Sequence, residues 1–335
     1  MHHNQTPLKS FIQADATRLP LADDSVSLAT TESKPMPEMK IKAIAGWFGG
    51  KRTMAPLIVK QLGEHVQYFE PFCGSMAVLF AKKPSPHETV NDLHQDLINL
   101  AMVLQDRESA IDLYERTMRT LFSESALDMA EAVLADPWEF VAGKGDRERA
   151  YWYFLATWMG RNGVAGTAAT DYQLAVRWTA NGGTPTTRFR SCTDSIPAWH
   201  ERLKNVVILR RDAFDIIPKF DDREGVSIYI DSPYTSDSRS GSLKGGHCGT
   251  YLHEFNHESD MFACDDHARL RDQLQRFQNA RVVVSHYDCD RVRKLYSGWT
   301  FIDCARMKNI HQQNGRGQRQ KEAPEVLIVN GDEYR

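Results

Sequence analysis

The sequence predicts an α/β fold in which helices cover both faces of a mostly parallel sheet. Short apolar runs rich in β-branched residues recur along the chain, and segments with helical periodicity separate them. Such runs are typical of strands in a parallel sheet, because the connecting helices bury both faces of each strand. The chain has 335 residues, of which 41% are hydrophobic and 25% charged. It is therefore long enough to form a large core.

The predicted elements begin after a segment with weak signals. Residues 1–40 contain four prolines and no sustained periodicity, which predicts a partly ordered leader. The elements expected next are a Gly-rich loop at 46–51, a helix at 54–62, a strand at 66–70, a tight turn at 71–75, a helix at 76–81 and a strand at 88–90. Later strands are expected at 206–209, 226–230, 281–285 and 325–329.

A long segment separates the early strands from the later ones. Helical patterns dominate residues 97–159, whereas residues 160–190 are rich in Gly, Thr, Arg and Asn and have little periodicity. We therefore predict that residues 41–105 and 206–335 form one domain. Residues 106–205 would be an insertion of helices and loops within it.

The first motif that carries chemistry is FEPFCGS at residues 69–75, which closes a predicted strand. Asn91 and Asp92 follow the next strand. Ligands of open α/β sheets bind outside the carboxyl ends of the strands, where a Gly turn admits the ligand and a later carboxylate can bind ribose hydroxyls. The pattern suits a cofactor that contains adenosine. An ordinary strand–turn–helix would also explain the motif on its own.

The second motif is YIDSPY at residues 229–234, directly after a predicted buried strand. Asp231 can accept a hydrogen bond from an amino group on a planar base, and a backbone carbonyl near Pro233 can accept its other hydrogen. Tyr234 can stack on the ring. An ordinary turn after a strand is the alternative interpretation.

The order of these motifs resembles that of the DNA adenine methyltransferase (Dam) family, the alpha-ordered amino methyltransferases. The matching segments are GWFGGK at 46–51, the motif at 69–75, Asn91 and Asp92, a long insertion and DSPY at 231–234. The likeness extends from Ala45 to Asn330. Phage-borne members look similar at RNGVAGT, residues 161–167.

The resemblance implies a Rossmann-like, S-adenosylmethionine-dependent methyltransferase fold, with the insertion as a target-recognition domain. The implied activity is site-specific methylation of the N6 amino group of adenine in double-stranded DNA, with the base flipped out of the helix. A phage or restriction-modification context would fit. Two acceptors would draw the amino hydrogens out of the ring plane, so that the nitrogen lone pair becomes localised for attack on the methyl group.

The resemblance also implies residue roles. Trp47 and Lys51 would hold the methionine end of the cofactor, and Asp92 would bind its ribose. The residues expected to line the pocket are Phe69, Glu70, Pro71, Phe72 and Gly74, with Asp212 and Phe214 near the cofactor adenine. Asp231, Pro233 and Tyr234 would be catalytic. The family usually carries Pro where this chain has Ser232, and the segment typical of members that read GATC is not apparent.

Contacts with DNA must come from local patches, because the formal net charge is −3. We predict base reading by Arg161, Asn162 and Arg177, and phosphate contacts by Arg188 and Arg190.

Two alternative functions remain open at this point. The first is a DNA-binding protein that has lost turnover through Ser232. The second is a zinc metalloprotease, because His253, Glu254 and His257 match the pattern of two metal-binding histidines around a glutamate base. The residues that follow lack the usual third ligand.

Partners and compartment follow from composition. The six cysteines are scattered without paired spacing, which predicts reduced thiols. No apolar run of about 18 residues and no signal peptide is visible, so we expect a cytoplasmic protein without a membrane partner. We further expect no metal, and a monomer or weak dimer.

Overall fold

The computed structural model describes residues 38–47, 49–141, 143, 145–160, 172–176, 183–234, 253, 265–304 and 325–334. The chain divides into two compact units, Met1–Glu38 and Met39–Arg335. Only Glu38 of the first unit is among the described residues, so the prediction of a partly ordered leader at 1–40 lies almost wholly outside them. Everything below concerns the second unit.

The described residues of this unit contain a seven-stranded sheet with the order β3-β2-β1-β4-β5-β7-β6. The strands are β1 (Gln67–Glu70), β2 (His87–Asn91), β3 (Val207–Leu209), β4 (Val226–Ile230), β5 (Arg281–Tyr287), β6 (Thr300–Asp303) and β7 (Glu325–Val329). β1 to β5 pair in parallel, and β7 runs antiparallel to β5 and β6. The predicted mostly parallel sheet is therefore confirmed, and each of the six predicted strands lies within about a residue or two of its observed bounds.

β6 was not predicted. It has only four residues, TFID, and lies at the edge of the sheet, where one residue of the four is buried. An edge strand of this length has no apolar run that could distinguish it from a loop.

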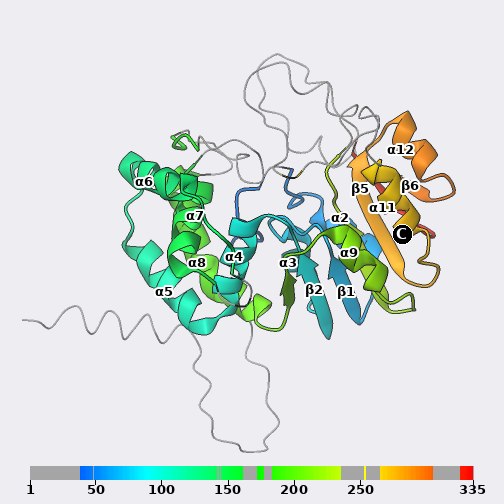
Figure 1. Cartoon of the computed structure of the whole chain (residues 1–335), viewed down its shortest axis with the longest axis horizontal. Coiled ribbons are helices and arrows are strands. Elements are labelled where there is room, and N and C mark those ends of the chain that lie inside the picture. Colours follow the sequence, from blue (N-terminus) through cyan, green and yellow to red (C-terminus); the bar gives the residue numbers. More distant parts are fainter. Residues whose placement is uncertain are drawn as a thin grey trace, which may run out of the picture. The chain divides into compact units, whose positions relative to one another are not determined.

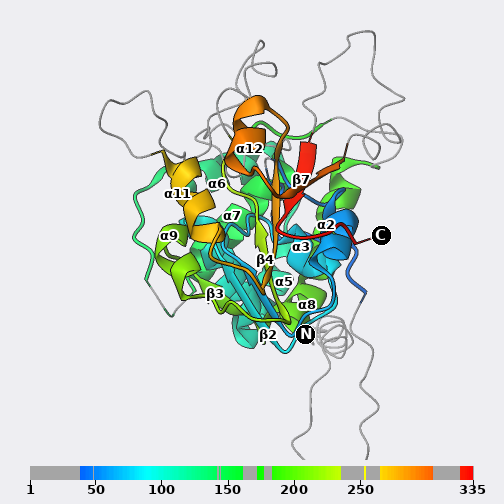
Figure 2. The ribbon, with the colours of Figure 1, turned by 90° about the vertical axis from the view of Figure 1, so that its right-hand side faces the viewer.

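Alternate residues of the strands pack into two separate cores, one on each face of the sheet. Tyr229 and Val283 belong to the first core, whereas their neighbours Ile230 and Val284 belong to the second. This alternation follows from the two-residue period of a strand. Figure 2 shows the consequence: α2 (Ala55–Leu62) and α3 (Ala77–Ala81) lie on one side of the sheet, and α9 (Ala213–Ile216) and α11 (Asp266–Leu274) on the other.

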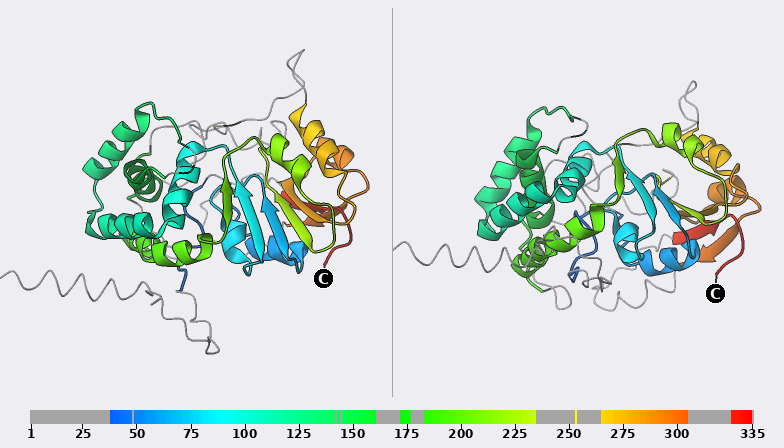
Figure 3. Two further views of the ribbon diagram at one scale, coloured as in Figure 1. Left: turned by 60° about the horizontal axis from the view of Figure 1, so that its bottom comes forward. Right: turned by 90° about the horizontal axis from the view of Figure 1, so that it is seen from below.

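Five longer helices are grouped beside the sheet (Figure 1, and from below in Figure 3). They are α4 (Gln95–Gln105), α5 (Arg107–Arg119), α6 (Glu124–Ala135), α7 (Arg147–Met159) and α8 (Pro185–Leu203). Side chains of the residue before each helix cap its N-terminus, as Asp106 does for α5 and Asp146 for α7.

α8 corrects the prediction that residues 160–190 lack periodic structure, because this helix begins at Pro185. Thr184 accepts a hydrogen bond from Thr187 N, and Pro185 occupies the first helical position. Both are recognised helix-start signals. Pro197 inside the helix and the polar residues of its first turns weakened the pattern.

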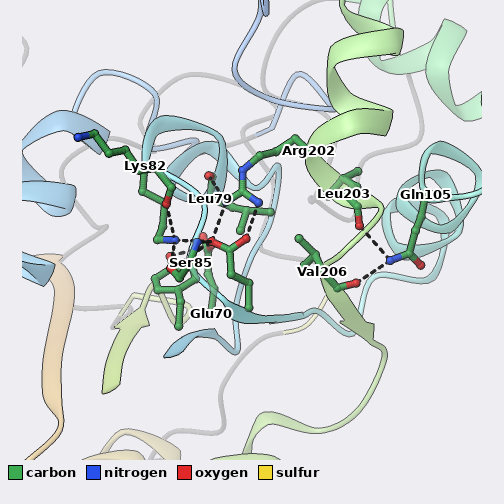
Figure 4. Close-up of polar contacts among 11 residues, drawn as sticks. Glu70, Leu79, Lys82, Ser85, Gln105, Arg202, Leu203 and Val206 are labelled. Atoms are coloured by element: carbon green, nitrogen blue, oxygen red, sulfur yellow. Dashed lines mark hydrogen bonds and ion pairs between the residues drawn. The ribbon is translucent and has the colours of Figure 1, made fainter. Parts of the chain in front are cut away.

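A buried ion cluster joins these helices to the sheet (Figure 4). The Glu88 carboxylate of β2 pairs with Lys82, which follows α3, and with Arg202 of α8. Arg202 also donates to Leu79 O at 3.0 Å. Nearby, Gln105 Nε2 donates to Leu203 O at 3.0 Å and to Val206 O at 2.6 Å. The start of β3 is thereby fixed against the helices.

Within the described ranges, no helix has both the length and the apolar character that a membrane span requires. Of the cysteines described there, Cys73, Cys192 and Cys289 are free thiols.

Candidate active site

A cavity of about 310 Å³ opens at the carboxyl ends of the central strands. Its walls come from the segments after β1, β2, β3 and β4, from the loop before α2 and from α11. This is the position at which ligands of open α/β sheets bind. Three predicted segments that are far apart in sequence, around Lys51, Gly74 and Asp231, meet in it.

The turn after β1 depends on Gly74. Its φ is +44°, and a Cβ built there would lie 2.8 Å from Trp47 Nε1. Any side chain would therefore be strained and would displace the indole. The Trp47 ring in turn contacts His94 edge to face, with 5.3 Å between ring centroids. Trp47, Gly74 and His94 thus form one wall of the cavity.

The end of β2 supplies the next pair of side chains. Asp92 accepts hydrogen bonds from Gly74 N and His94 N, one on each carboxylate oxygen, both at 2.9 Å. Asn91 donates to Pro71 O and Arg211 O and accepts from Arg211 N. Asn91 therefore ties the ends of β1, β2 and β3 together. The sequence analysis named Asn91 beside Asp92 but did not predict that Asn91 would connect these strand ends.

Glu70 is the most strongly perturbed acid of the cavity for which a value is resolved. Burial, with a smaller contribution from the nearby Asp231, raises the pKa of its carboxyl from 4.5 to about 8. The Tyr68 hydroxyl donates to Oε2 at 2.9 Å and works in the opposite direction. A cationic ligand in the cavity would favour the ionised form.

Asp231 lies directly after β4, and one of its carboxylate oxygens is held by two donors. Ser285 Oγ donates to Oδ1 at 2.8 Å, and Lys51 Nζ lies 3.0 Å from the same oxygen. Burial raises the pKa of Asp231, whereas Lys51 and the Ser285 hydrogen bond lower it. The carboxylate, whose side chain is 20% exposed, is therefore partly withdrawn from water and compensated by these two groups.

Lys51 connects this carboxylate to a second one. Its side chain is 7% exposed, and Nζ lies 3.4 Å from Glu325 Oε1 as well as near Asp231. The same nitrogen lies 4.9 Å from the centroid of the Tyr234 ring. Sequence reasoning missed Glu325, because it appeared only as the first residue of a strand.

Pro233 lines the cavity, but Tyr234 is not among the lining residues. The Tyr234 hydroxyl donates to Glu325 Oε1 at 3.0 Å, and the ring stacks on His286 with 4.7 Å between centroids. It also contacts the Tyr287 ring at 4.6 Å. The aromatic side chain predicted for base stacking is thus a buried, fixed wall beside the cavity.

At the far end, Asp212 caps α9 by accepting from Phe214 N at 2.8 Å. The guanidinium carbon of Arg269 lies 4.1 Å from the centroid of the Phe214 ring. Arg269 and Asp266 of α11 both line the cavity. The sequence prediction did not include these two residues as site residues, since an Arg or Asp on an amphipathic helix carries no signal of its own.

Most of the predicted cofactor and catalytic residues meet in this cavity. Those that line it are Trp47, Lys51, Glu70, Pro71, Phe72, Gly74, Asp92, Asp212, Phe214, Asp231 and Pro233. Phe69 is a correction, because its ring stacks on Phe220 at 3.9 Å in the second core. Its neighbour Glu70 faces the cavity, and successive strand residues point to opposite faces.

The predicted DNA contacts can be located only in part. Arg188 is half-buried, and burial lowers its pKa. Arg190 is exposed and donates to Met118 O at 2.8 Å, at the end of α5. Arg161, Asn162 and Arg177 lie outside the described residues.

The metalloprotease pattern is also only partly described. His253 lines the cavity, whereas Glu254 and His257 lie outside the described residues. Among the residues that the structure describes, no three His, Cys, Asp or Glu side chains are grouped as metal ligands.

Comparisons with known proteins agree with this geometry. The profile of the family described as D12 class N6 adenine-specific DNA methyltransferase matches residues 47–132, which include the glycine turn. The retron Ec67 DNA adenine methylase of Escherichia coli is 25% identical over 302 residues, which cover 87% of this chain and 92% of that protein. The type II methyltransferase M1.LlaDCHI of Lactococcus lactis subsp. cremoris is 25% identical over 305 residues, with 88% and 96% covered.

A DNA adenine methylase of Haemophilus influenzae is 23% identical over 287 residues, which cover 85% of this chain and 93% of that protein. The family profile spans the loop around Lys51, the glycine turn and Asp92, and the relatives extend the similarity over most of the chain. Residues 47–132 therefore match the D12 class of N6 adenine-specific DNA methyltransferases, enzymes that use S-adenosylmethionine, and the chain is similar to DNA adenine methylases over most of its length.

Proposed function

We propose that the cavity holds S-adenosylmethionine and that Asp231, with the backbone beside Pro233, presents the N6 amino group of a DNA adenine to it. One observation carries this proposal: the glycine turn at Gly74, the loop around Lys51 and the carboxylate of Asp231 line the same cavity. A cofactor site and an amino-group acceptor are thereby adjacent, as methyl transfer requires.

The lining fits this cofactor on two counts. Gly74 has no side chain, so the Trp47 indole packs directly on the backbone of the turn and the two shape one wall of the cavity. Asp92 and Asp231 offer negative charge to a ligand that carries ammonium and sulfonium groups, and such a ligand would favour ionisation of Glu70 as well. A volume of about 310 Å³ is at the lower end of the range for small-molecule sites, roughly 300–1,000 Å³.

Individual roles follow from position. We assign Trp47 and Lys51 to the methionine end, and Glu70, Pro71, Phe72 and Gly74 to the surrounding wall. Each oxygen of Asp92 accepts one backbone hydrogen bond and keeps a lone pair for a ribose hydroxyl. Asp212 and Phe214 are assigned to the cofactor adenine.

The chemistry of the acceptor follows from its fixed position. When bound, the cofactor supplies an electrophilic methyl group on a sulfonium centre. Asp231 accepts one hydrogen of the adenine amino group, and a backbone carbonyl near Pro233 accepts the other. These two contacts draw the hydrogens from the plane of the purine and localise the nitrogen lone pair. Positioning supplies a large part of the rate.

The adenine must leave the DNA helix to enter this pocket, at a cost of a few kcal/mol. Tyr234 is buried beside the cavity and held by Glu325 and by its contacts with His286 and Tyr287, so its stacking on the everted base remains a prediction that requires the ring to become accessible.

We assign target recognition to residues 106–205, which contain α5 to α8. Base reading by Arg161, Asn162 and Arg177 and phosphate contacts by Arg188 and Arg190 remain predictions. We also infer the alpha order of motifs, since residues 69–75 precede the insertion and 231–234 follow it. An origin in a phage or a restriction-modification system also remains a prediction.

Transfer of a labelled methyl group from S-adenosylmethionine to duplex DNA tests the proposal. Asp231→Ala should lower the turnover number by a factor of roughly 10²–10⁴ and leave cofactor affinity, measured by calorimetry, within a few-fold. Asp221→Ala, at an exposed aspartate that pairs with Arg223, is the matched control. An equal loss of both quantities would assign Asp231 to the cofactor site instead.

Sequencing of the methylated DNA would identify the target. A wild type that binds DNA without transferring methyl groups would support the alternative of an impaired enzyme, with Ser232 as its cause.

A further inference from the structure

A chain of three buried side-chain oxygens ends at the proposed catalytic carboxylate. Tyr229 Oη lies 3.0 Å from Ser285 Oγ, which lies 2.8 Å from Asp231 Oδ1. Tyr229 is 1% exposed and Ser285 is fully buried. The two side chains come from β4 and β5, which are hydrogen-bonded neighbours in the sheet. The core of the protein thus contacts the acceptor from behind.

The donors and acceptors in this chain can be assigned. An ionised Asp231 only accepts, so Ser285 must donate its one hydrogen to Oδ1. The Tyr229 hydroxyl must then be the donor to Ser285 Oγ. Ile230 O is also within reach of Ser285 Oγ, at a longer distance of 3.5 Å, and the Tyr234 hydroxyl lies close to the serine as well. Tyr229 therefore holds the serine hydroxyl in the rotamer that points at the carboxylate.

Both protein contacts of Asp231 engage the same oxygen. Ser285 donates to Oδ1 and Lys51 Nζ lies closest to the same oxygen, and among the residues described here no hydrogen bond reaches Oδ2. We propose that Ser285, oriented by Tyr229, is a positioning residue that anchors Oδ1 of Asp231 so that Oδ2 is left to accept the amino hydrogen of the substrate. This inference rests on the proposed catalytic role of Asp231.

Ser285 and Tyr229 could instead be a simple bridge between two strands, and the chain contains comparators for that case. Ser227 of β4 is equally buried, and its Oγ donates to Leu62 O at 2.9 Å, far from the cavity. Tyr153 of α7 is 1% exposed, and its hydroxyl has no hydrogen-bond partner in the part of the chain described. Ser227→Ala and Tyr153→Phe are therefore matched controls for Ser285→Ala and Tyr229→Phe.

The test is steady-state methylation of duplex DNA by the full chain, with cofactor affinity and thermal midpoint measured for each variant. Ser285→Ala should lower kcat roughly 10- to 100-fold, the usual range for losing a hydrogen bond to a charged group, with KM for DNA within about 3-fold. Tyr229→Phe should lower kcat by less, since the serine can still reach Asp231. Ser285→Thr keeps the hydroxyl and should restore most of the rate.

Two further measurements separate positioning from mere support of the fold. The double variant should be no slower than Ser285→Ala alone, because the Tyr229 hydroxyl, the group that phenylalanine lacks, reaches Asp231 only through the serine. The acidic limb of the pH–rate profile should move to higher pH in Ser285→Ala, since a hydrogen bond that lowers the pKa of Asp231 is lost. The charged groups that face Asp231 from other elements, Lys51, Glu70 and Glu325, stay in place in this variant.

The outcomes are distinguishable. Wild-type kcat and an unmoved acidic limb in Ser285→Ala, with an inactive Asp231→Ala, would overturn the inference and leave the proposed function intact. Additive losses of kcat in the double variant would also overturn the inference. The same holds if Ser227→Ala loses as much kcat as Ser285→Ala. If Ser285→Ala does not fold, Tyr229→Phe is compared with Tyr153→Phe instead. A lower kcat and a shifted acidic limb in Tyr229→Phe alone would support the inference, and equal values in the two variants would overturn it. An active Asp231→Ala contradicts the proposed function, and the inference then fails with it.

Discussion

Nζ of Lys51 lies 3.0 Å from Oδ1 of Asp231, and both side chains are largely withdrawn from water. The same nitrogen lies 3.4 Å from Glu325, so one ammonium group serves two carboxylates. Attraction between opposite charges is stronger in such surroundings than in water. Lys51 therefore offsets the burial and the charge of Glu325, both of which raise the pKa of Asp231.

Replacing Lys51 should shift the pH dependence of methylation. In the proposed mechanism Asp231 accepts the amino hydrogen in its ionised form, so activity should fall as the pH drops through the pKa of this carboxyl. Lys51→Met removes the group that lowers this pKa, so the acidic limb of the pH–rate profile should move to higher pH, with a lower kcat at neutral pH. The measurement is methyl transfer between pH 5 and 9. Lys60→Met, at an exposed lysine of α2, should leave the profile where it is.

Glu70 should make cofactor binding depend on pH. Its pKa is raised to about 8, so the carboxyl of the free enzyme is mostly neutral at pH 7. A cationic cofactor favours the ionised form, and its affinity should therefore increase as the pH rises towards about 8. Calorimetry of S-adenosylmethionine binding at pH 6 and 8 measures this difference. Glu70→Gln should abolish it, and an undiminished pH dependence in this variant would contradict the assignment.

The Glu70 carboxyl should also make stability depend on pH. Stability should fall as the pH rises, whereas cofactor affinity should increase. Because the pKa is higher in the folded state than the ordinary value of 4.5, the folded state binds the proton more tightly. This contribution to stability is fully present below pH 4.5 and is lost as the pH rises through about 8. The thermal midpoint of the cofactor-free protein should therefore decline over this range by more in the wild type than in Glu70→Gln.

The buried cluster around Glu88 should matter for stability and not for chemistry. Glu88→Gln would leave Lys82 and Arg202 as buried cations without their shared carboxylate. We expect a loss of about 3–5 kcal/mol in the free energy of unfolding, measured by urea denaturation. Glu115→Gln breaks an exposed pair with Arg119 and should cost less than about 1 kcal/mol. Equal losses of unfolding free energy in Glu88→Gln and Glu115→Gln would show that the buried cluster stabilises the protein no more than an exposed ion pair does.

The sequence predicted the parts of the fold that have strong local signals. Six strands were predicted because they are short apolar runs, and the cavity lining because FEPFCGS and DSPY combine a turn with reactive groups. β6 and the start of α8 lacked such signals. Ser285, Glu325 and Arg269 could not be assigned in advance, since their roles come from tertiary contacts between distant elements.

Gly74 and Gly298 allow the effect of backbone strain to be separated from the effect of lost space in the cofactor cavity. Both have positive φ, +44° and +90°, so alanine at either position should cost about 1–3 kcal/mol in stability. Only at Gly74 would the new Cβ meet another group, Trp47 Nε1 at 2.8 Å, whereas nothing lies within 4 Å at Gly298.

Gly74→Ala should therefore lower the affinity for S-adenosylmethionine by roughly tenfold or more, and Gly298→Ala should leave it within about twofold, since each factor of ten corresponds to about 1.4 kcal/mol. Calorimetric titration of both variants, with the indole fluorescence as a second readout, measures the difference. Equal affinities in the two variants would mean that cofactor binding does not depend on the packing of Trp47 on Gly74, and the cofactor site would have to be reassigned.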